Sequence, residues 1–361
     1  MWIESIKIDN VTVFDELRTD FSKGINVFIG NNGTGKTHLL KFMYAYCETI
    51  NFVKTNNEQL IHQNMMENYF ELFENCLLYY LFDCFPPRFS SVLVRYKGRP
   101  SRIAARFHNH EDFLPLDEIN FLIEAKLYLS NFIIGKPNEG SANLISSVFI
   151  PAKEMLTHTG LDNDYRDRRL PFDKTLIDII EKSTVSELRS LPNDMKEIIE
   201  KIHNIIGGEV VYDKTSFFIE RGGAKRSFQV EAEGHKKLAL IERLIKTGKI
   251  TKGAIIFWDE PEANISPRNV PELVDILFDL QKAGVQIFLA THDYLVAKYI
   301  EYRMDSESND VLFHSFYREE SGNAESPVLV ESSVDFTEME HNDIVLQPIT
   351  LYKKLLEKGM D

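Results

Sequence analysis

Residues 30–37 read Gly-Asn-Asn-Gly-Thr-Gly-Lys-Thr and match the pattern G-x-x-x-x-G-K-[ST] at all four fixed positions. The apolar run 25–29 before them predicts a strand, and the apolar pattern 38–43 after them predicts a helix. A glycine-rich turn between a strand and a helix is the context in which this pattern binds phosphate groups. A chance glycine turn would have to match both the motif and its flanks, so we predict a phosphate-binding loop.

Each part of this loop has a predicted role. The three glycines let the backbone curl so that its N–H groups point at a polyphosphate. Lys36 is expected to reach the terminal phosphates of ATP, and the Thr37 hydroxyl to ligate Mg²⁺. The predicted nucleotide-binding residues are Gly30, Asn31, Asn32, Gly33, Thr34, Gly35, Lys36 and Thr37.

An acidic motif lies far downstream, where the apolar run 254–258 ends in Asp259 and Glu260. The run predicts a central parallel strand, whose acids would emerge at the carboxyl edge of the sheet. There Asp259 is expected to help hold Mg²⁺, and Glu260 to deprotonate the attacking water. A capping acid at a strand end is the alternative, but the pairing with the loop at residue 30 favours a role in hydrolysis.

With these two motifs the chain resembles the ATP-binding cassette superfamily, in particular its soluble branch of SMC, RecF and OLD-like ATPases. Residues 2–10 and 21–26 are similar to the N-terminal hairpin that leads into the phosphate loop in that branch. The resemblance implies an α/β P-loop NTPase fold with a mixed central sheet, an N-terminal antiparallel β lobe and a short helical lid. It also implies ATP and Mg²⁺ as cofactors.

Two further segments match this family in order and spacing. Residues 259–267 are similar to the stretch that follows the catalytic glutamate and crosses to a second subunit. His292, in Ala-Thr-His-Asp after the apolar run 285–289, resembles the histidine that contacts the γ-phosphate. Alone, His292 would be a surface histidine at a strand end. Together with the other motifs it becomes the second predicted catalytic residue, beside Glu260.

The signature helix of the family has a degenerate counterpart at residues 231–240. The Ser-Gly-Gly of the family is here Ala232-Glu233-Gly234, so the serine hydroxyl is missing. Gly234 still permits a close approach to the phosphate of a partner subunit, and Lys236 or Lys237 could add positive charge. An ordinary amphipathic helix start with solvated lysines is the alternative.

The glutamine loop of the family is replaced by another sequence. After the predicted strand 146–150 comes Pro-Ala-Lys-Glu at 151–154. Lys153 or Glu154 could sense nucleotide or Mg²⁺, and a plain strand-to-helix turn is equally compatible with the sequence.

The charge and the cysteine content limit the possible partners and the cellular compartment of the protein. The 361 residues include 41 Lys and Arg against 55 Asp and Glu, and the net charge of −14 is unsuited to a general nucleic-acid coat. The three cysteines lack C-x-x-C spacing, which indicates a reducing compartment, so we expect a cytoplasmic protein. No apolar run approaches ~20 residues, so no membrane span is expected.

The interval 38–230 carries the lobe-specific insertions of one predicted ATPase domain, which spans 1–361. Residues 65–82 predict an aromatic helix, and 88–110 hold six Lys or Arg and no acid in a predicted hairpin. This basic segment could bind nucleic acid or an acidic partner, although a solvated strand face is its more ordinary explanation. The interval lacks sustained heptads, so we expect no long coiled coil.

The remaining elements are predicted from their periodicity and turn residues. We expect helices within 176–206, two or three strands within 209–230, a terminal hairpin of 311–317 and 328–330, and a closing helix over 350–358. This leaves no room for a nuclease domain after the last helix, so nuclease activity is expected to reside on another polypeptide.

Three functions are compatible with these features. The first is an ATPase that forms a head-to-tail homodimer or higher homo-oligomer through its ATP sites and regulates a separate effector, a nuclease or toxin, in bacterial anti-phage defence. That step rests on family resemblance alone. The second is a RecF-like, ATP-gated clamp on DNA. The third is a slowly hydrolysing scaffold, which the degenerate signature favours and the intact Glu260 and His292 oppose.

Overall fold

The structure is a computed structural model of the whole chain. It describes residues 1–56, 76–77, 80–85, 95, 99, 101–108, 119–123, 144–168, 172–304, 310–319 and 325–358. Most of the predicted aromatic helix at 65–82 lies outside these residues, although 76–77 and 80–82 are helical. Of the first strand of the basic segment, 91–97, only Arg95 is described, so that strand stays a prediction.

A mixed six-stranded sheet forms the centre, in the order β13-β12-β3-β11-β10-β6. Its strands are β3 (Ile25–Gly30), β6 (Ser147–Ile150), β10 (Ile255–Asp259), β11 (Gln286–Ala290), β12 (Val311–Tyr317) and β13 (Leu329–Ser333). The neighbouring pairs are parallel except β12 and β13. Every residue of β3 and β11 is buried, which explains why these strands are continuous apolar runs. The mixed sheet is confirmed.

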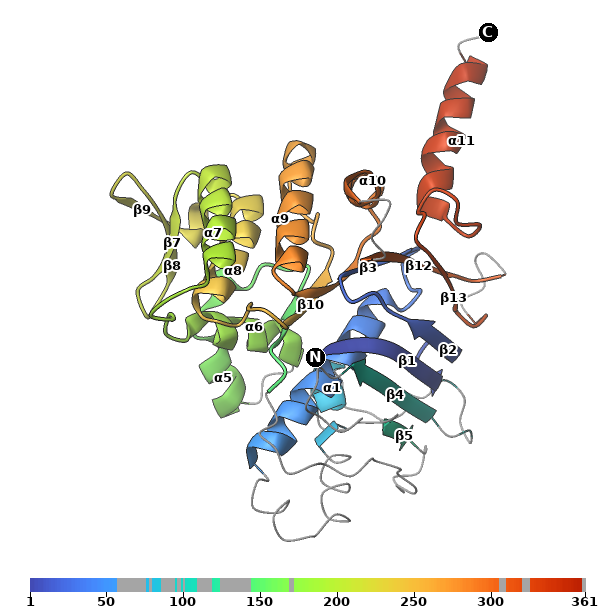
Figure 1. Cartoon of the computed structure of the whole chain (residues 1–361), viewed down its shortest axis with the longest axis horizontal. Coiled ribbons are helices and arrows are strands. Elements are labelled where there is room, and N and C mark those ends of the chain that lie inside the picture. The colour runs from blue at the N-terminus through green and yellow to red at the C-terminus, as the bar shows by residue number, and fades with distance from the viewer. Residues whose placement is uncertain are drawn as a thin grey trace.

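An antiparallel sheet in the order β2-β1-β4-β5 covers one side (Figure 1). Its strands are β1 (Trp2–Val11), β2 (Phe14–Asp20), β4 (Ser101–His108) and β5 (Ile119–Ile123). Helix α1 (Lys36–Asn56) shares one hydrophobic core with this sheet and with Phe28, Phe257 and Phe288 of the central strands. The N-terminal hairpin is confirmed. The return strand of the basic segment is β4, which pairs with β1 and β5.

Helices cover the other face of the central sheet, where a second core joins them to it. They are α7 (Asn193–Ile206), α8 (Glu233–Lys246), α9 (Val270–Lys282) and α10 (Tyr294–Arg303). Helices α5 (Leu161–Arg168) and α6 (Lys174–Thr184) precede them. The remaining short pieces are η1 (Leu156–His158), η2 (Phe228–Val230), η3 (Pro267–Asn269) and the three-stranded sheet β7 (Glu209–Tyr212), β8 (Phe217–Arg221), β9 (Ala224–Ser227).

The last helix differs from its prediction. Helix α11 runs over Asp343–Lys358, so it begins well before Thr350 and continues through Pro348. None of its residues is buried, and it projects from the body (Figure 1). Because the helix is solvated, the backbone carbonyl that Pro348 leaves without an N–H partner can bind water, which lowers the cost of the proline. Among the described residues the longest helix is α1, of 21 residues, in line with the absence of long coiled-coil arms.

Candidate nucleotide site

The phosphate-binding loop connects β3 to α1, as the sequence predicts. Gly30 has φ 137°, and a Cβ there would lie 2.2 Å from the Phe316 carbonyl oxygen, so only glycine fits. Gly33 has φ 77°, and a Cβ there would meet no atom of the described residues within 4 Å. The loop therefore packs tightly at its start and opens to free space at its tip, which is the form of a cradle for a phosphate group.

Lys36 points back into the loop. Its ammonium donates to the carbonyl oxygens of Gly30, at 2.7 Å, and Asn31, at 2.8 Å. Burial lowers the pKa of Lys36 to about 8, although the carboxylates of Asp259 and Glu260 act in the opposite direction. The ammonium is thus held inside the cradle, beside the acids that follow β10.

The Thr37 hydroxyl donates to both carboxylate oxygens of Asp259, at 3.0 and 3.1 Å. This contact joins the start of α1 to the end of β10, although β11 lies between β3 and β10 in the sheet. Burial raises the pKa of Asp259, and the hydrogen bond from Thr37 opposes that shift. A hydroxyl and a carboxylate facing one another offer the oxygen ligands that Mg²⁺ prefers, so the two residues fit a magnesium site.

Glu260 follows directly and has a left-handed backbone, with φ 48°. Its N–H donates to the Ala290 carbonyl at 2.8 Å, which fixes this turn to the end of β11. The side chain is 39% exposed, and its Oε1 lies 3.5 Å from Nδ1 of His292, which follows β11. A glutamate rarely adopts positive φ without compensation, so the surrounding contacts hold this carboxylate at the mouth of the site.

The loops after β10 and β11 are tied to one another and to α8. Glu262 is half-buried, and its carboxylate accepts a hydrogen bond from the Thr291 hydroxyl at 2.6 Å. Lys237 donates to the carbonyl of Glu260 at 2.8 Å. These contacts position Glu260 and His292. The sequence did not indicate these positioning roles of Glu262 and Lys237, because neither of the two has a motif of its own.

The degenerate signature segment forms the start of α8. Ala232 occupies the N-cap position and makes no side-chain capping bond. A Cβ at Gly234 would lie 3.3 Å from the carbonyl oxygen of Asn264, so this end of α8 packs on the loop after Glu260. Lys236 is buried and pairs with Glu233 at 2.7 Å and Glu154 at 3.9 Å. Its ammonium is therefore engaged within its own chain.

Glu154 caps the short helix η1. Its carboxylate accepts hydrogen bonds from the backbone N–H of Leu156 and, at 3.2 Å, of Thr157. Lys153 is exposed. The Glu154 contacts favour the plain turn over a nucleotide sensor at this position.

Two residues from the end of the chain reach the phosphate loop, and sequence reasoning missed both. Arg318, just after β12, donates to the Gly33 carbonyl at 3.1 Å. Asp343, at the start of α11, accepts a hydrogen bond from the Asn31 side chain. These residues line a cavity of about 550 Å³ beside the loop. Arg318 lies 285 positions after Gly33 in the sequence, and Asp343 lies 312 positions after Asn31. Neither residue belongs to a local sequence pattern.

The comparisons with known proteins agree with this geometry. The family model described as "AAA domain, putative AbiEii toxin, Type IV TA system" matches residues 103–297, which is more than half of the chain. The chain belongs to this family. A second AAA domain model matches residues 5–61. The protein is thus a P-loop ATPase domain of the class that includes ABC, SMC and RecF proteins.

This AAA domain shares a short segment with DNA replication and repair proteins named RecF. It is 46% identical over 61 residues to the protein of Cytophaga hutchinsonii, covering 17% of this chain and 16% of that one. The protein of Streptococcus pyogenes serotype M1 is 39% identical over 62 residues, covering 17% of each chain. The chain therefore spans about one-sixth of the length of these curated relatives.

The fold of the AAA domain is shared with SMC heads. The SMC head domain from Thermotoga maritima aligns with a TM-score of 0.50 at 11% identity, over 92% of this chain and 99% of that one. The Smc head with an extended coiled coil from Pyrococcus furiosus gives a TM-score of 0.50 at 11% identity, over 100% of both chains. At this identity the likeness shows the fold alone. No helix in the described part of the AAA domain is long and apolar enough to span a membrane.

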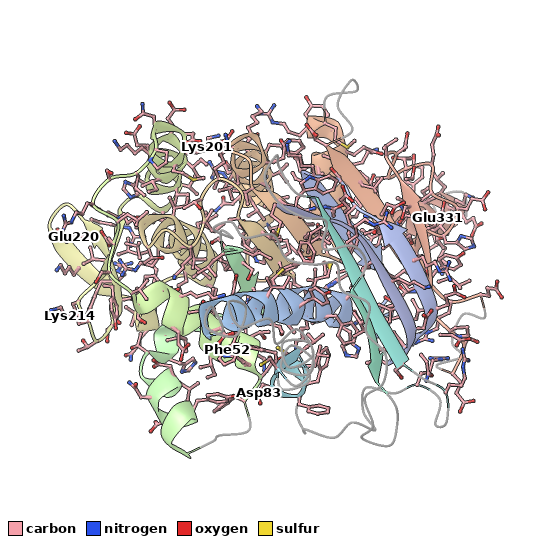
Figure 2. All side chains as sticks on the ribbon, turned by 60° about the horizontal axis from the view of Figure 1, so that its bottom comes forward. Phe52, Asp83, Lys201, Lys214, Glu220 and Glu331 are labelled. Atoms are coloured by element: carbon pink, nitrogen blue, oxygen red, sulfur yellow. The ribbon has the colours of Figure 1, made fainter. Side chains whose placement is uncertain are left out.

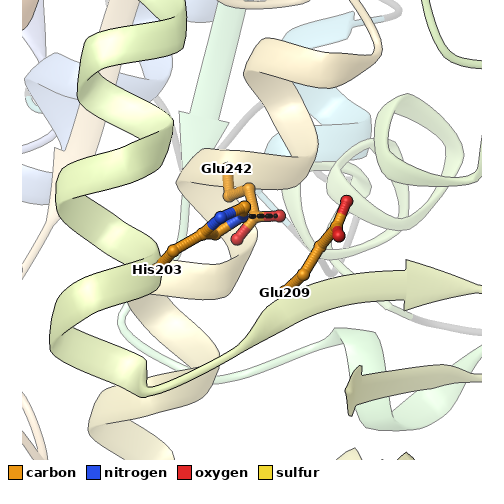
Figure 3. Close-up of side chains that lie close together, drawn as sticks. All are labelled: His203, Glu209 and Glu242. Atoms are coloured by element: carbon orange, nitrogen blue, oxygen red, sulfur yellow. Dashed lines mark ion pairs between the residues drawn. The ribbon is translucent and has the colours of Figure 1, made fainter. Parts of the chain in front are cut away.

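A second cluster of the AAA domain resembles a metal site but is already neutralised. The ligand atoms of His203, Glu209 and Glu242 lie within 4.8 Å of one another (Figure 3). However, the Lys246 ammonium pairs with Glu242 at 2.7 Å and with Glu209 at 2.6 Å. Burial would lower the pKa of Lys246, but the two carboxylates outweigh burial and raise it. The cluster ties α7, β7 and α8 together.

We therefore expect Glu242→Gln to lower the free energy of unfolding by about 1–2 kcal/mol, because fully buried Glu242 loses its charge next to Lys246. The matched control Glu209→Gln, at a side chain that is 57% exposed, should cost less than about 1 kcal/mol. Denaturant unfolding measures both. Equal effects, or stabilisation of the parent protein by added Zn²⁺, would contradict the ion-pair assignment.

Proposed function

We propose that this AAA domain binds and hydrolyses ATP with Mg²⁺. The observation that carries the proposal is the meeting of two side-chain pairs, Thr37 with Asp259 and Glu260 with His292, at the carboxyl edge of one sheet. Lys36 and the loop N–H groups would bind the phosphates. Thr37 and Asp259 would hold Mg²⁺, which when bound neutralises phosphate charge.

Within that site Glu260 is the base. Its carboxylate is partly exposed and lies at the mouth of the cradle, where it can accept a proton from a water molecule that attacks the terminal phosphate. His292 orients Glu260 and can donate a hydrogen bond to the charge that develops on the phosphate. The positive φ of Glu260 and its bond to Ala290 keep the carboxylate in position.

We further propose a head-to-tail assembly over two ATP molecules. The start of α8 packs on the loop after Glu260 rather than closing over the phosphate loop of its own chain, as the approach of Gly234 to Asn264 indicates. In the proposed assembly the α8 start of a second copy completes the site. ATP would then hold two copies together, and hydrolysis would release them.

The biological role that we propose is regulation of a separate effector, a nuclease or toxin, in bacterial anti-phage defence. The description of the family names a putative toxin of a Type IV toxin–antitoxin system, which supports a place in such a system. ATP-dependent pairing of two copies would supply the switch that such an effector reads.

A RecF-like clamp on DNA is the second candidate, favoured by the 46% identity to RecF over 61 residues. A slowly hydrolysing scaffold is the third, favoured by Ala232 in place of the signature serine. Turnover measured with and without DNA separates the three: a clamp is stimulated by DNA, a scaffold turns over negligibly in both conditions, and the effector-regulating ATPase hydrolyses ATP without DNA.

Gly234→Leu is the variant that tests the assembly. A leucine Cβ at this position would lie 3.3 Å from the Asn264 carbonyl oxygen of its own chain, so the larger side chain would displace the start of α8, which is proposed to meet the phosphate of the second copy. We expect turnover to fall at least about tenfold while ATP affinity stays within about threefold of wild type. Turnover per subunit of the wild type should also rise with protein concentration. An equal loss of ATP binding and turnover would mean that residues 231–237 serve only the fold.

A further inference from the structure

The hairpin of β8 and β9 is a basic surface at one end of the molecule. Arg221, Lys225 and Arg226 line a cavity of about 480 Å³ together with Val230, which is 73% exposed. Arg221 is committed to Glu231, at 2.6 Å. Lys225 lies 4.0 Å from Glu220, and Arg226 has no ion pair among the described residues. Lys225 and Arg226 thus present positive charge to solvent in a chain whose net charge is −14.

An acidic segment lies beside the phosphate loop. Residues 331–343 contain five Asp and Glu and no Lys or Arg. Two of the acids, Glu340 and Asp343, line the cavity that the phosphate loop shares, together with half-exposed Leu346. Within the described ranges Glu338 and Glu340 form no ion pair. The acidic segment therefore has carboxylates available to a partner.

These carboxylates create an electrostatic problem for ATP. The triphosphate is anionic, and like charges within a few ångströms repel. Among the described residues that line this cavity, Arg318 is the only lysine or arginine. Its guanidinium already donates hydrogen bonds to the carbonyls of Gly33 and Ser326. Additional cations near the acidic segment would offset the repulsion and stabilise the ATP-bound state.

The β8–β9 hairpin cannot supply those cations within one chain. The hairpin and α11 lie at opposite ends of the molecule (Figure 1), and Glu220 of the hairpin is far from Glu331 of the acidic segment in Figure 2. In the proposed head-to-tail assembly, however, the α8 start of one copy meets the phosphate loop of the other. Glu231 and His235, which flank that α8 start, also line the cavity of the hairpin.

We propose that the β8–β9 hairpin of one copy binds the acidic segment of a second copy. Lys225 and Arg226 pair with Glu338 and Glu340, and Val230 is positioned to meet Leu346. The interaction rests on the head-to-tail assembly proposed above, and adds to it an interface outside the ATP contacts. The hairpin would also supply positive charge near the ATP of the second copy. The degenerate signature segment does not supply that charge, because Lys236 is paired within its own chain.

Charge reversal tests the interface in the Glu260→Gln background, where ATP is not consumed. We expect Lys225→Glu with Arg226→Glu, and separately Glu338→Lys with Glu340→Lys, each to weaken ATP-dependent assembly at least about tenfold in sedimentation velocity. Combining the four changes should restore assembly to within about threefold of the parent. The hairpin reversal should leave ATP binding by the dilute monomer unchanged. Rising salt should weaken the parent assembly.

Three results discriminate. If the parent assembles with ATP and the reversals change nothing, or the combined variant is no better than either pair, the hairpin interface is wrong while the ATP assembly stands. If the parent does not assemble with ATP, both proposals fail. If a reversal variant no longer unfolds cooperatively, a cross-linking test replaces it. One copy carries Arg226→Cys and the other Glu340→Cys, and the mixed copies are tested for a disulfide bond between them. A disulfide that forms only with ATP supports the interface, and its absence in a parent that assembles overturns the interface.

Discussion

Lys36→Ala is expected to remove ATP binding, with a loss of affinity of at least about 100-fold. Charge-assisted hydrogen bonds to the two terminal phosphates are worth about 1.5–3 kcal/mol each, so about 3 kcal/mol or more together, and each 1.4 kcal/mol is a factor of ten. Lys36 is 9% exposed and is held inside the cradle by two loop carbonyls, so no other side chain can take its place without rebuilding the loop. Isothermal titration with Mg-ATP measures the loss.

The control for this variant is Lys196→Ala, which removes an exposed lysine on α7. It should bind ATP with wild-type affinity. Thermal unfolding shows whether Lys36→Ala is folded. Retention of wild-type affinity by folded Lys36→Ala would contradict the phosphate site.

Glu260→Gln is expected to bind ATP normally and to lose turnover by about 10²–10⁴-fold, the usual contribution of a general base. The amide is similar in size to the carboxylate and keeps the positive-φ turn and the bond to Ala290, but it cannot take a proton from water. The binding contacts of Lys36 and Thr37 are untouched. Phosphate release measured under single-turnover conditions separates this effect from a defect in binding.

Glu272→Gln on α9 is the matched control, because it makes the same chemical change at a partly buried glutamate that takes part in none of the site contacts described above. Its turnover should remain within about twofold of wild type. Wild-type turnover by Glu260→Gln would show that another group activates the water, and Glu262, which is hydrogen-bonded to Thr291, would be the next candidate.

The central strands and the phosphate loop could be predicted because their signals are local. β3, β10 and β11 are apolar runs that the sheet buries on both faces, and polar side chains mark the ends where they reach the site. Asp259 and Glu260 were found for the same reason. A parallel sheet brings the ends of its strands to one edge, so the sequence also indicated that these acids lie near Thr37.

The contacts of α8 and the C-terminal segment could not be predicted, because they depend on tertiary packing. Helix α8 is buried at every position from Lys236 to Lys246, so its lysines form ion pairs or hydrogen bonds within the chain and not a solvated face. Arg318 and Asp343 reach the loop from a part of the chain with no motif. The predicted helix began at Thr350, after Pro348, and the exposure of α11 explains why the proline is accommodated within it.

The mass of Glu260→Gln in solution with Mg-ATP tests the central claim most directly. Sedimentation or light scattering should give at least twice the monomer mass when ATP is present. The same variant with ADP, or the double variant with Lys36→Ala, should give the monomer mass. Assembly by Glu260→Gln that requires ATP would support a nucleotide-bridged, head-to-tail ATPase. A monomer that binds ATP tightly at every concentration, or an oligomer of the same mass with and without nucleotide, would contradict it.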